Sequence, residues 1–217
     1  MKLLIIDTAL DLCTIGLFAV ADRKARPLAM RSEAMSKGHQ ERLGVLAQEV
    51  KTQAGGFDRI ERIGVTVGPG SFTGLRVGLS FAQGLGAALG VPVVGLSTLD
   101  ALAEGRTDAA ALIDARRGQV YARIWKDGAP TDQPRALDLE TARAAISDLN
   151  PEQLIGSGAL LFGVETPQGR LGPDPAALAR LAARLDPSTN PPTPLYLRAP
   201  DATPPTRLPG QARPART

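Results

Sequence analysis

The sequence contains very few of the residues on which many protein chemistries depend. Its 217 residues include one cysteine, Cys13, and one histidine, His39. One cysteine excludes a disulfide within the chain and any cysteine-based metal cluster, and one histidine excludes a site with two histidine ligands. Cys13 stands in a strand-like alternation, which favours a buried core thiol over a nucleophile. We therefore expect this chain to hold no metal.

Long apolar runs are also absent. No run reaches the roughly 18 residues that a membrane-spanning helix needs. The opening stretch, residues 1–7, is too short for a signal peptide and ends on an acid, Asp7. Hydrophobic residues make up 43% of the chain and charged residues 22%, which is ordinary for a globular protein. We expect a cytoplasmic protein that makes no membrane contact.

Aromatic residues make up only 4% of the chain, and the excess positive charge lies at one end. The net charge is +3, and residues 199–217 hold Arg207, Arg213 and Arg216 against Asp201. The rest of the chain is therefore close to neutral, and it has no basic patch with interleaved aromatics. Direct RNA binding by the folded part alone is not expected.

Hydrophobic periodicity divides the chain into two similar series of elements. Residues 1–97 predict the order β-β-β-α-β-α-β, with strands at 2–7, 13–20, 26–33, 62–67 and 92–96 and helices at 36–54 and 71–89. Residues 98–198 predict a smaller series, with strands at 109–114, 119–126, 135–137 and 154–156 and helices at 98–104, 139–149 and 175–185. This alternation implies an α/β protein with mixed sheets and helices on their faces. Nine prolines after residue 186 lead us to expect a disordered tail over residues 199–217.

The segment Gly68-Pro69-Gly70-Ser71-Phe72-Thr73-Gly74-Leu75-Arg76 joins a predicted strand to a predicted helix. A glycine turn before a helix N-terminus favours an anion, because free backbone N–H groups and the helix dipole both attract negative charge. Contact with an anion or a nucleotide is one interpretation for Gly68, Gly70 and Ser71, and for Asp7 and Thr8 at the end of the first strand. The alternatives are a turn-capping Asp7 and an N-cap Ser71. The segment lacks the Gly-Lys-Ser/Thr of a P-loop, and no histidine accompanies its hydroxyls, so we expect no catalytic residue.

The second predicted helix carries small residues at four-residue spacing, with larger apolar residues beside them. The small residues are Gly74, Gly78, Ala82 and Gly86, and the apolar ones are Val77, Phe81 and Leu85. Each interior glycine costs roughly 1 kcal/mol relative to alanine, so this stripe needs close packing as compensation. It packs either on the protein's own sheet or on a partner subunit. The first predicted helix has a comparable face, formed by His39, Leu43, Leu46 and Val50, with His39 serving packing or partner contact.

Four blocks of the sequence resemble the bacterial TsaB (YeaZ-like) family. They are Leu4-Ile5-Ile6-Asp7-Thr8, the block from Gly68 to Gly78, the stretch from Leu112 to Tyr121, and Tyr196-Leu197-Arg198. They occur in the order of the family and span nearly the whole chain before the tail. The block that begins at Gly68 is the most specific of them. The stretch from Leu112 includes Arg116-Arg117, which we interpret as a solvated pair at a hairpin turn, with an anion contact as the alternative.

The resemblance implies an actin-like ATPase fold with two related lobes, the second reduced around residues 157–174. It implies a dimerisation subunit that binds TsaD, the protein that threonylcarbamoylates N6 of adenosine 37 in tRNAs reading codons that begin with A. The ATPase TsaE joins this complex, tRNA is reached only through it, and ATP or ADP is expected at the partner interface rather than on this chain alone. The family contact maps onto residues 36–54 and 71–89. The expected interface is His39, Leu43, Leu46, Val50, Gly74, Val77, Gly78, Phe81, Ala82 and Leu85.

Two other functions stay open on the sequence. An active small kinase or ATPase of the same fold would need Asp7 and the Gly68–Gly70 turn to bind nucleotide unaided. A protease-like activity would need a nucleophile and a base, and the sequence offers no such pair. TsaD carries a two-histidine motif on its first corresponding helix, whereas this chain has only His39 there. That difference favours a non-catalytic subunit, which we expect to form a homodimer through the same two helices when it is isolated.

Overall fold

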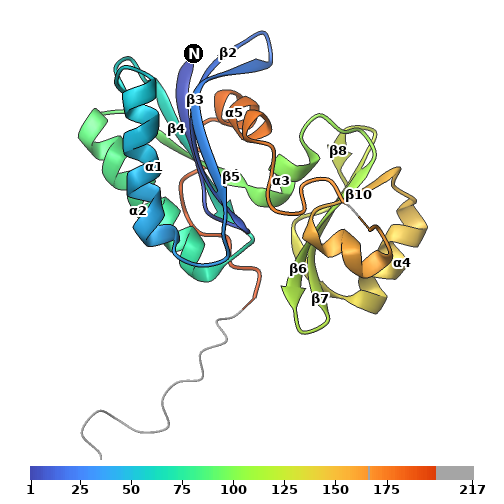
Figure 1. The fold of residues 1–217 in the computed structure, drawn as a ribbon. Coiled ribbons are helices and arrows are strands. Elements are labelled where there is room, and N and C mark those ends of the chain that lie inside the picture. Colours follow the sequence, from blue (N-terminus) through green and yellow to red (C-terminus); the bar gives the residue numbers. More distant parts are fainter. Residues whose placement is uncertain (166, 199–217) are drawn as a thin grey trace, which may run out of the picture.

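The computed structural model describes residues 1–165 and 167–198, so the predicted disordered tail at 199–217 lies outside the described residues. The first lobe contains the strands β1 (Lys2–Asp7), β2 (Leu12–Ala21), β3 (Lys24–Ala34), β4 (Arg62–Gly68) and β5 (Val93–Ser97). Its helices are α1 (His39–Gln53) and α2 (Phe72–Leu89), and α3 (Thr98–Ala103) leads into the second lobe. Figure 1 shows the two lobes side by side, joined through α3.

The first sheet has the strand order β3-β2-β1-β4-β5. β2 is antiparallel to both of its neighbours, whereas β1, β4 and β5 run parallel to one another. Parallel neighbours need a crossover connection, and α1 and α2 supply the two crossovers. β1 and β4 are buried along nearly their whole length because helices cover both faces of the sheet.

Alternate residues of β1 face different helices, as the two-residue period of a strand requires. Leu4 and Ile6 belong to the cluster formed with α1 and α2. Leu3 and Ile5 belong to the cluster formed with the last helix, α5 (Pro175–Arg184). The first sheet is therefore the middle layer of three, and Figure 1 shows α5 on the face opposite α1 and α2.

The position of α5 corrects one part of the sequence-based division. The helix belongs by sequence to the predicted second series, residues 98–198, but it packs on the first sheet through Leu178, Leu181 and Ala182. A Cβ on Gly64 would lie 2.7 Å from the Cβ of Ala182, so the missing side chain at Gly64 is what lets α5 approach β4. The chain thus returns to its first lobe before it ends.

The second lobe repeats the first lobe's topology and then departs from it. Its elements are β6 (Ala109–Arg116), β7 (Gln119–Lys126), β8 (Ala129–Pro130), β9 (Arg135–Asp138), α4 (Leu139–Leu149), β10 (Gln153–Ile155) and the 3₁₀ helix η1 (Ser157–Phe162). The pairings β9-β7-β6-β10 match β3-β2-β1-β4 in order and direction. No counterpart of β5 is found among the described residues, because a 3₁₀ helix and a loop follow β10. The predicted α/β class, with two related lobes of which the second is reduced, is confirmed.

Most predicted elements lie within a few residues of the observed ones. The start of α1 is the clearest difference, because the helix begins at His39 and not at the predicted residue 36. Gly38 has φ 87° and ψ 11°, a left-handed conformation that no residue of a right-handed helix adopts. In contrast, β1 has the predicted bounds, and α2 ends at Leu89 before the left-handed Gly90.

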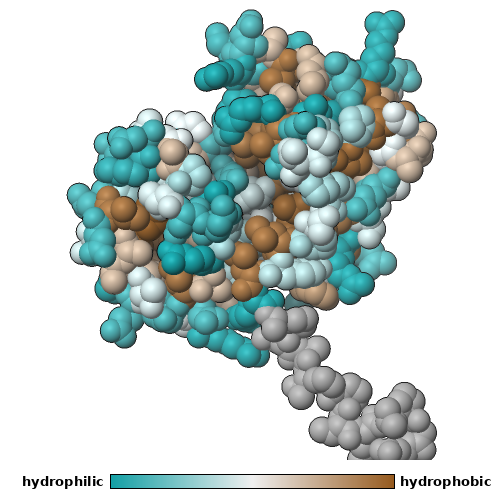
Figure 2. Space-filling model, turned by 180° about the vertical axis from the view of Figure 1, so that it is seen from behind, coloured by the Kyte–Doolittle hydropathy of each residue, from teal (hydrophilic) through white to brown (hydrophobic). Residues whose placement is uncertain are grey.

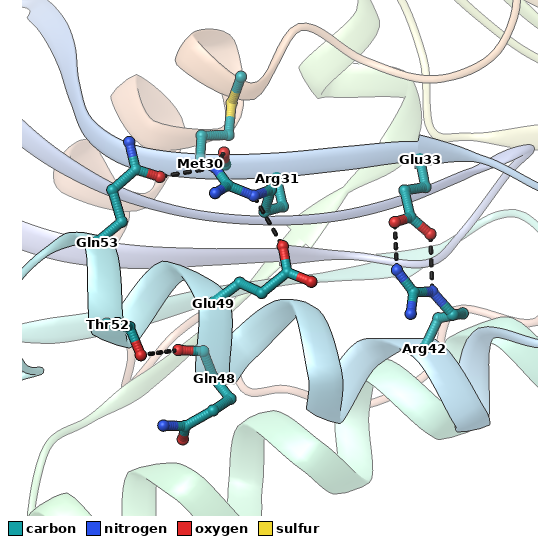
Figure 3. A network of polar contacts seen from close by, with 8 residues as sticks. All are labelled: Met30, Arg31, Glu33, Arg42, Gln48, Glu49, Thr52 and Gln53. Atoms are coloured by element: carbon teal, nitrogen blue, oxygen red, sulfur yellow. Dashed lines mark hydrogen bonds and ion pairs between the residues drawn. The ribbon is translucent and has the colours of Figure 1, made fainter.

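Polar contacts fasten α1 to the edge strand β3, as Figure 3 shows. Arg42 donates two hydrogen bonds to the Glu33 carboxylate, one of them at 2.8 Å. Arg31 donates to Glu49 at 2.8 Å and to Gln53 at 2.6 Å. The guanidinium of Arg42 holds the pKa of Glu33 below its usual range. These contacts line one side of α1 and leave the side nearer α2 available for other contacts.

Candidate functional site

The glycine turn after β4 and the start of α2 pack against the end of β1. Ser71 has extended backbone angles, and its hydroxyl accepts a hydrogen bond from the N–H of Gly74 at 3.2 Å. Its own N–H donates to the carbonyl of Ala9 at 2.7 Å. The N-cap interpretation of Ser71 is therefore confirmed, and the turn is tied to the residues that follow β1.

The small-residue stripe of α2 faces this protein's own first strand. A Cβ would lie 2.1 Å from the Thr8 carbonyl oxygen if placed on Gly74, and 2.3 Å from the Thr8 hydroxyl if placed on Gly78. Ala82 is fully buried in the same cluster. The expectation that Gly74, Gly78 and Ala82 contact a partner is wrong, because the chain's own backbone and core occupy that space.

The apolar face of α1 is also internal. Leu43, Leu46 and Val50 are buried in the cluster between α1, α2 and the sheet, and His39 is 6% exposed. These four residues cannot form a contact surface, so their assignment to the interface is wrong as well. The other three predicted interface residues, Val77, Phe81 and Leu85, are half-buried and lie along the outer side of α2.

A shallow apolar groove of about 340 Å³ runs between the outer sides of α1 and α2. Phe81, Leu85 and Leu89 line it from α2, and Gly44, Ala47, Gln48 and Lys51 line it from α1. Val45, which is 45% exposed, does not line this groove but a second hollow on the β3 side of α1, together with Arg31 and Glu49. Sequence reasoning missed Leu89, although it continues the four-residue spacing of Val77, Phe81 and Leu85 and was therefore a usable signal.

Asp7 and Thr8 are turned into the protein. Asp7 is 1% exposed, and its carboxylate accepts hydrogen bonds from the Ala9 N–H at 3.0 Å and from the Thr66 hydroxyl at 2.8 Å. Burial raises the pKa of the Asp7 carboxyl, and the two hydrogen bonds partly oppose that shift. The predicted anion contact of Asp7 and Thr8 is contradicted by their burial, and Asp7 serves as a turn cap.

A cleft of about 630 Å³ lies between the two lobes. Gly70 and Ser71 line it from the first lobe, whereas Gly68 lies beneath the backbone of Leu195 and does not reach it. The second lobe contributes Asp114, Arg116, Tyr121 and Ser157. Figure 2 shows brown, apolar residues in the middle of the molecule, between the two lobes, surrounded by teal ones.

The segment Asn190–Arg198, which we call the strap, crosses one side of this cleft. The Leu195 N–H donates to the carbonyl of Val67 in the first lobe at 2.8 Å. Arg198 donates to the carbonyl of Ala115 in the second lobe at 2.9 Å. The strap thus links both lobes and contributes Leu195, Tyr196, Leu197 and Arg198 to the cleft wall.

The described ranges, 1–165 and 167–198, contain no group of three or more His, Cys, Asp or Glu side chains placed to hold a metal ion. None of their helices is long and apolar enough to cross a membrane.

Comparison with known proteins gives a consistent set of relatives. The family model of TsaD, described as tRNA N6-adenosine threonylcarbamoyltransferase, matches residues 31–133. An uncharacterized protein of Mycobacterium bovis, Mb3455c, is 36% identical over 211 residues, which cover 93% of this chain and 93% of that protein. The tRNA threonylcarbamoyladenosine biosynthesis protein TsaB of Escherichia coli is 35% identical over 128 residues, which cover 56% of this chain and 53% of that protein. The solved structure of YeaZ from Pseudomonas aeruginosa covers 90% of this chain at 25% identity, with a TM-score of 0.69.

The chain is TsaB/YeaZ-like.

This TsaB/YeaZ-like chain spans about half the length of some of its curated relatives. It covers 56% of an uncharacterized Mycobacterium leprae protein, ML0378, to which it is 35% identical. The Pseudomonas structure, in contrast, is covered over 99% of its own length. The TsaD match includes both α1 and α2 and ends between β8 and β9, so the groove between these helices lies within the region shared with that family.

Proposed function

We propose that this chain is a non-catalytic subunit that binds a TsaD-like protein and supports N6-threonylcarbamoylation of adenosine 37 in tRNAs that decode codons beginning with A. The names of its TsaB relatives and the match to the TsaD family support this role. In the proposed complex the ATPase TsaE is a further partner, and ATP or ADP binds at the subunit interface.

The observation that carries the proposal is the apolar groove between α1 and α2. Phe81, Leu85 and Leu89 present apolar surface there, and Lys51 and Gln48 lie beside them. Gly44 on α1 and Gly84 on α2 are exposed, and a Cβ on either would meet nothing within 4 Å. A partner helix can therefore approach both backbones closely at these two glycines. They replace Gly74 and Gly78 as the small residues of the proposed interface.

The same groove supports the proposed homodimer of the isolated chain. Two copies that pack α1 and α2 against each other would bury this apolar surface from both sides, as isologous dimers do. A TsaD-like partner would then compete with the second copy for one face. Raising the partner concentration should convert the homodimer into the mixed complex, which light scattering can follow.

Co-expression with TsaD tests the docking face. We expect Leu85→Glu and Leu89→Glu to abolish co-purification and tRNA modification, because each places an unpaired charge in the apolar contact. Leu161→Glu is the matched control, since Leu161 is 38% exposed but lies on η1 in the other lobe. Intact complex formation by both groove variants would overturn the assignment. Substitutions at Leu46 or Gly78 would test folding instead, because these residues are buried.

A small kinase or ATPase is the second candidate, and the size of the interlobe cleft is the observation in its favour. A cleft of about 630 Å³ is large enough for a nucleotide. The acid available at the end of β1 is Asp7, which is enclosed and hydrogen-bonded to Ala9 and Thr66. Calorimetry on the isolated chain distinguishes the two proposals, because micromolar ATP binding with turnover would contradict the non-catalytic role.

A further inference from the structure

Arginines that lie far apart in the sequence meet around the interlobe cleft. Arg116 lines it from the turn between β6 and β7, Arg170 from the loop before α5, and Arg198 from the strap. Arg76 lies nearby on the first turns of α2, with its guanidinium 5.3 Å from the ring centre of Phe72. The lining also includes two carboxylates, and one of them, Asp114, is paired with Arg116 at 3.4 Å. The cleft lining therefore has more arginines than carboxylates. This excess of positive charge is not visible in any one stretch of the sequence.

The turn that holds Arg116 and Arg117 keeps two arginines in an unfavourable backbone conformation. Arg116 has φ 63° and Arg117 has φ 53°, followed by Gly118 at φ 70°. Asn, Asp and Gly are the residues that usually occupy left-handed positions in tight hairpins, because a longer side chain is strained there. The side chain of Arg116 is 79% exposed, so burial does not explain its presence. Arg23 in the hairpin between β2 and β3 has the same conformation at φ 59°, so the position of Arg116 at the cleft, and not its backbone angle, is what points to a role.

An aromatic pair borders the same cleft. Phe72 at the start of α2 is 45% exposed, and Tyr196 in the strap is 44% exposed. Their ring centres lie 5.0 Å apart with the planes tilted by 33°, and both residues line the cleft. Exposed aromatic faces beside guanidinium groups are the combination that binds single-stranded nucleic acid, in which bases stack on rings and phosphates meet arginines.

We infer that the interlobe cleft mouth of this chain binds a single-stranded segment of RNA. Phe72 and Tyr196 offer the stacking surface, and Arg116, Arg170 and Arg198 face the phosphates, with Arg117 next to Arg116 in the same turn. A free nucleoside triphosphate fits less well. The carboxylate of Asp7, which would be needed to hold its metal ion, is buried. The inference rests on the proposed function in one respect, since RNA is the substrate of the proposed complex. The inference goes beyond the proposed function because it gives this chain an RNA contact of its own.

Fluorescence anisotropy of the isolated full chain tests the inference directly. The probe is a fluorescein-labelled single-stranded oligoribonucleotide of about 12 nucleotides, within the site size of known single-strand binders. We expect binding at low salt that weakens as salt rises, because counterions are released when arginines meet phosphates. Unlabelled ATP serves as a competitor. Displacement by micromolar ATP would overturn the RNA inference in favour of a small-molecule site.

The double variant Arg116→Asn with Arg117→Asn removes two charges and relieves the left-handed strain, so it should fold at least as well as the wild type. We expect its affinity for the oligoribonucleotide to fall about tenfold, and the slope of log affinity against log salt to shrink by roughly 1 to 2. Phe72→Ser should weaken binding about fivefold or more through lost stacking.

Arg23→Asn is the matched control, because Arg23 is an exposed arginine with φ 59° in the hairpin between β2 and β3. That hairpin lies at the start of β1, and the cleft lies at its end. Equal losses in Arg23→Asn and in the double variant would overturn the inference, as would unchanged binding in the double variant. The double variant should still co-purify with TsaD, so failure of RNA binding and failure of the docking proposal are separable.

Discussion

Thr8 and Gly74 lie against each other where β1 ends and α2 begins. The hydroxyl of Thr8 donates a hydrogen bond of 2.7 Å to the carbonyl oxygen of Gly74. A Cβ on Gly74 would lie only 2.1 Å from the carbonyl oxygen of Thr8. The glycine is thus required by a contact within this chain, and the helix sits closer to the strand than any other residue would allow.

The first prediction compares two glycines of α2. Gly74→Ala should lower the free energy of unfolding by about 2–3 kcal/mol, because the added methyl group collides with the Thr8 backbone, which cannot move aside easily. Gly84→Ala should raise it by up to about 1 kcal/mol, since alanine favours the helix and nothing lies within 4 Å of the new atom. Urea denaturation measures both. Equal effects at the two positions would contradict the packing described for Gly74.

The second prediction concerns the pH dependence that Asp7 imposes. Burial raises the pKa of Asp7 above its usual 3.8, so the folded state holds a proton that the unfolded state releases. The contribution of Asp7 to stability is therefore largest below pH 3.8 and is lost as pH rises through the raised pKa. Asp7→Asn keeps both hydrogen-bond acceptor contacts without the charge. The variant should be more stable than the wild type at pH 7.

Melting curves collected from pH 4 to pH 8 check this sign. The difference between Asp7→Asn and the wild type should widen with rising pH and become small near pH 4. Asp11→Asn is the control, because Asp11 is exposed and lies just beyond the same strand. A wild type that gains stability relative to Asp7→Asn as the pH rises would contradict the buried environment of Asp7.

The third prediction concerns the reactivity of Cys13. The thiol is fully buried, and burial raises its pKa to about 11, with the charges of Asp7 and Glu33 adding to the shift. At pH 8 only about one molecule in a thousand would carry the reactive thiolate. Cys13 should therefore resist a thiol reagent in the native protein and react within seconds to minutes in denaturant. Rapid reaction of the native protein would show that β2 is not packed as described.

The fourth prediction concerns the strap. Arg198 ties the strap to the second lobe through the Ala115 carbonyl, while Leu195 ties it to the first lobe. Arg198→Met should lower the free energy of unfolding by about 1 kcal/mol, because a charged hydrogen bond across the cleft is lost. The Leu195 amide should also exchange its hydrogen faster. Arg26→Met, at an exposed arginine on β3, is the control and should change neither quantity.

Whether a segment forms a helix or a strand could be predicted from the local sequence pattern. Which other element it packs against could not. The apolar runs at β1 and β4 and the N-cap at Ser71 are local signals, and each element formed where its signal lies. The partner of α5 is not a local matter. Its apolar face suits either lobe, and the absence of a side chain at Gly64 lets it pack on the first sheet. The sequence places that glycine more than a hundred residues away from the helix.

The candidate site was predicted in outline and corrected in detail. The two helices were found by their periodicity, but the choice of face went wrong for seven of the ten residues. Leu43 and Gly78 belong to stripes that look equally fit for a partner or for a core, because apolar and small residues suit both. Only the position of the sheet decides between them. Val77, Phe81 and Leu85 lie beside the buried glycine stripe and are only half-buried, so part of their surface stays exposed.

The sequence by itself determined the α/β class, the repeated element order, the N-cap at Ser71, the buried thiol of Cys13 and the family resemblance. These depend on residue type and spacing over a few turns of chain. Only the tertiary structure decided which helix faces stay exposed and which charges meet. Arg116, Arg170 and Arg198 gather at one cleft because two lobes and a returning strap enclose it. Which arginines become neighbours depends on how the layers pack, and no local pattern in the sequence encodes which distant segments come together.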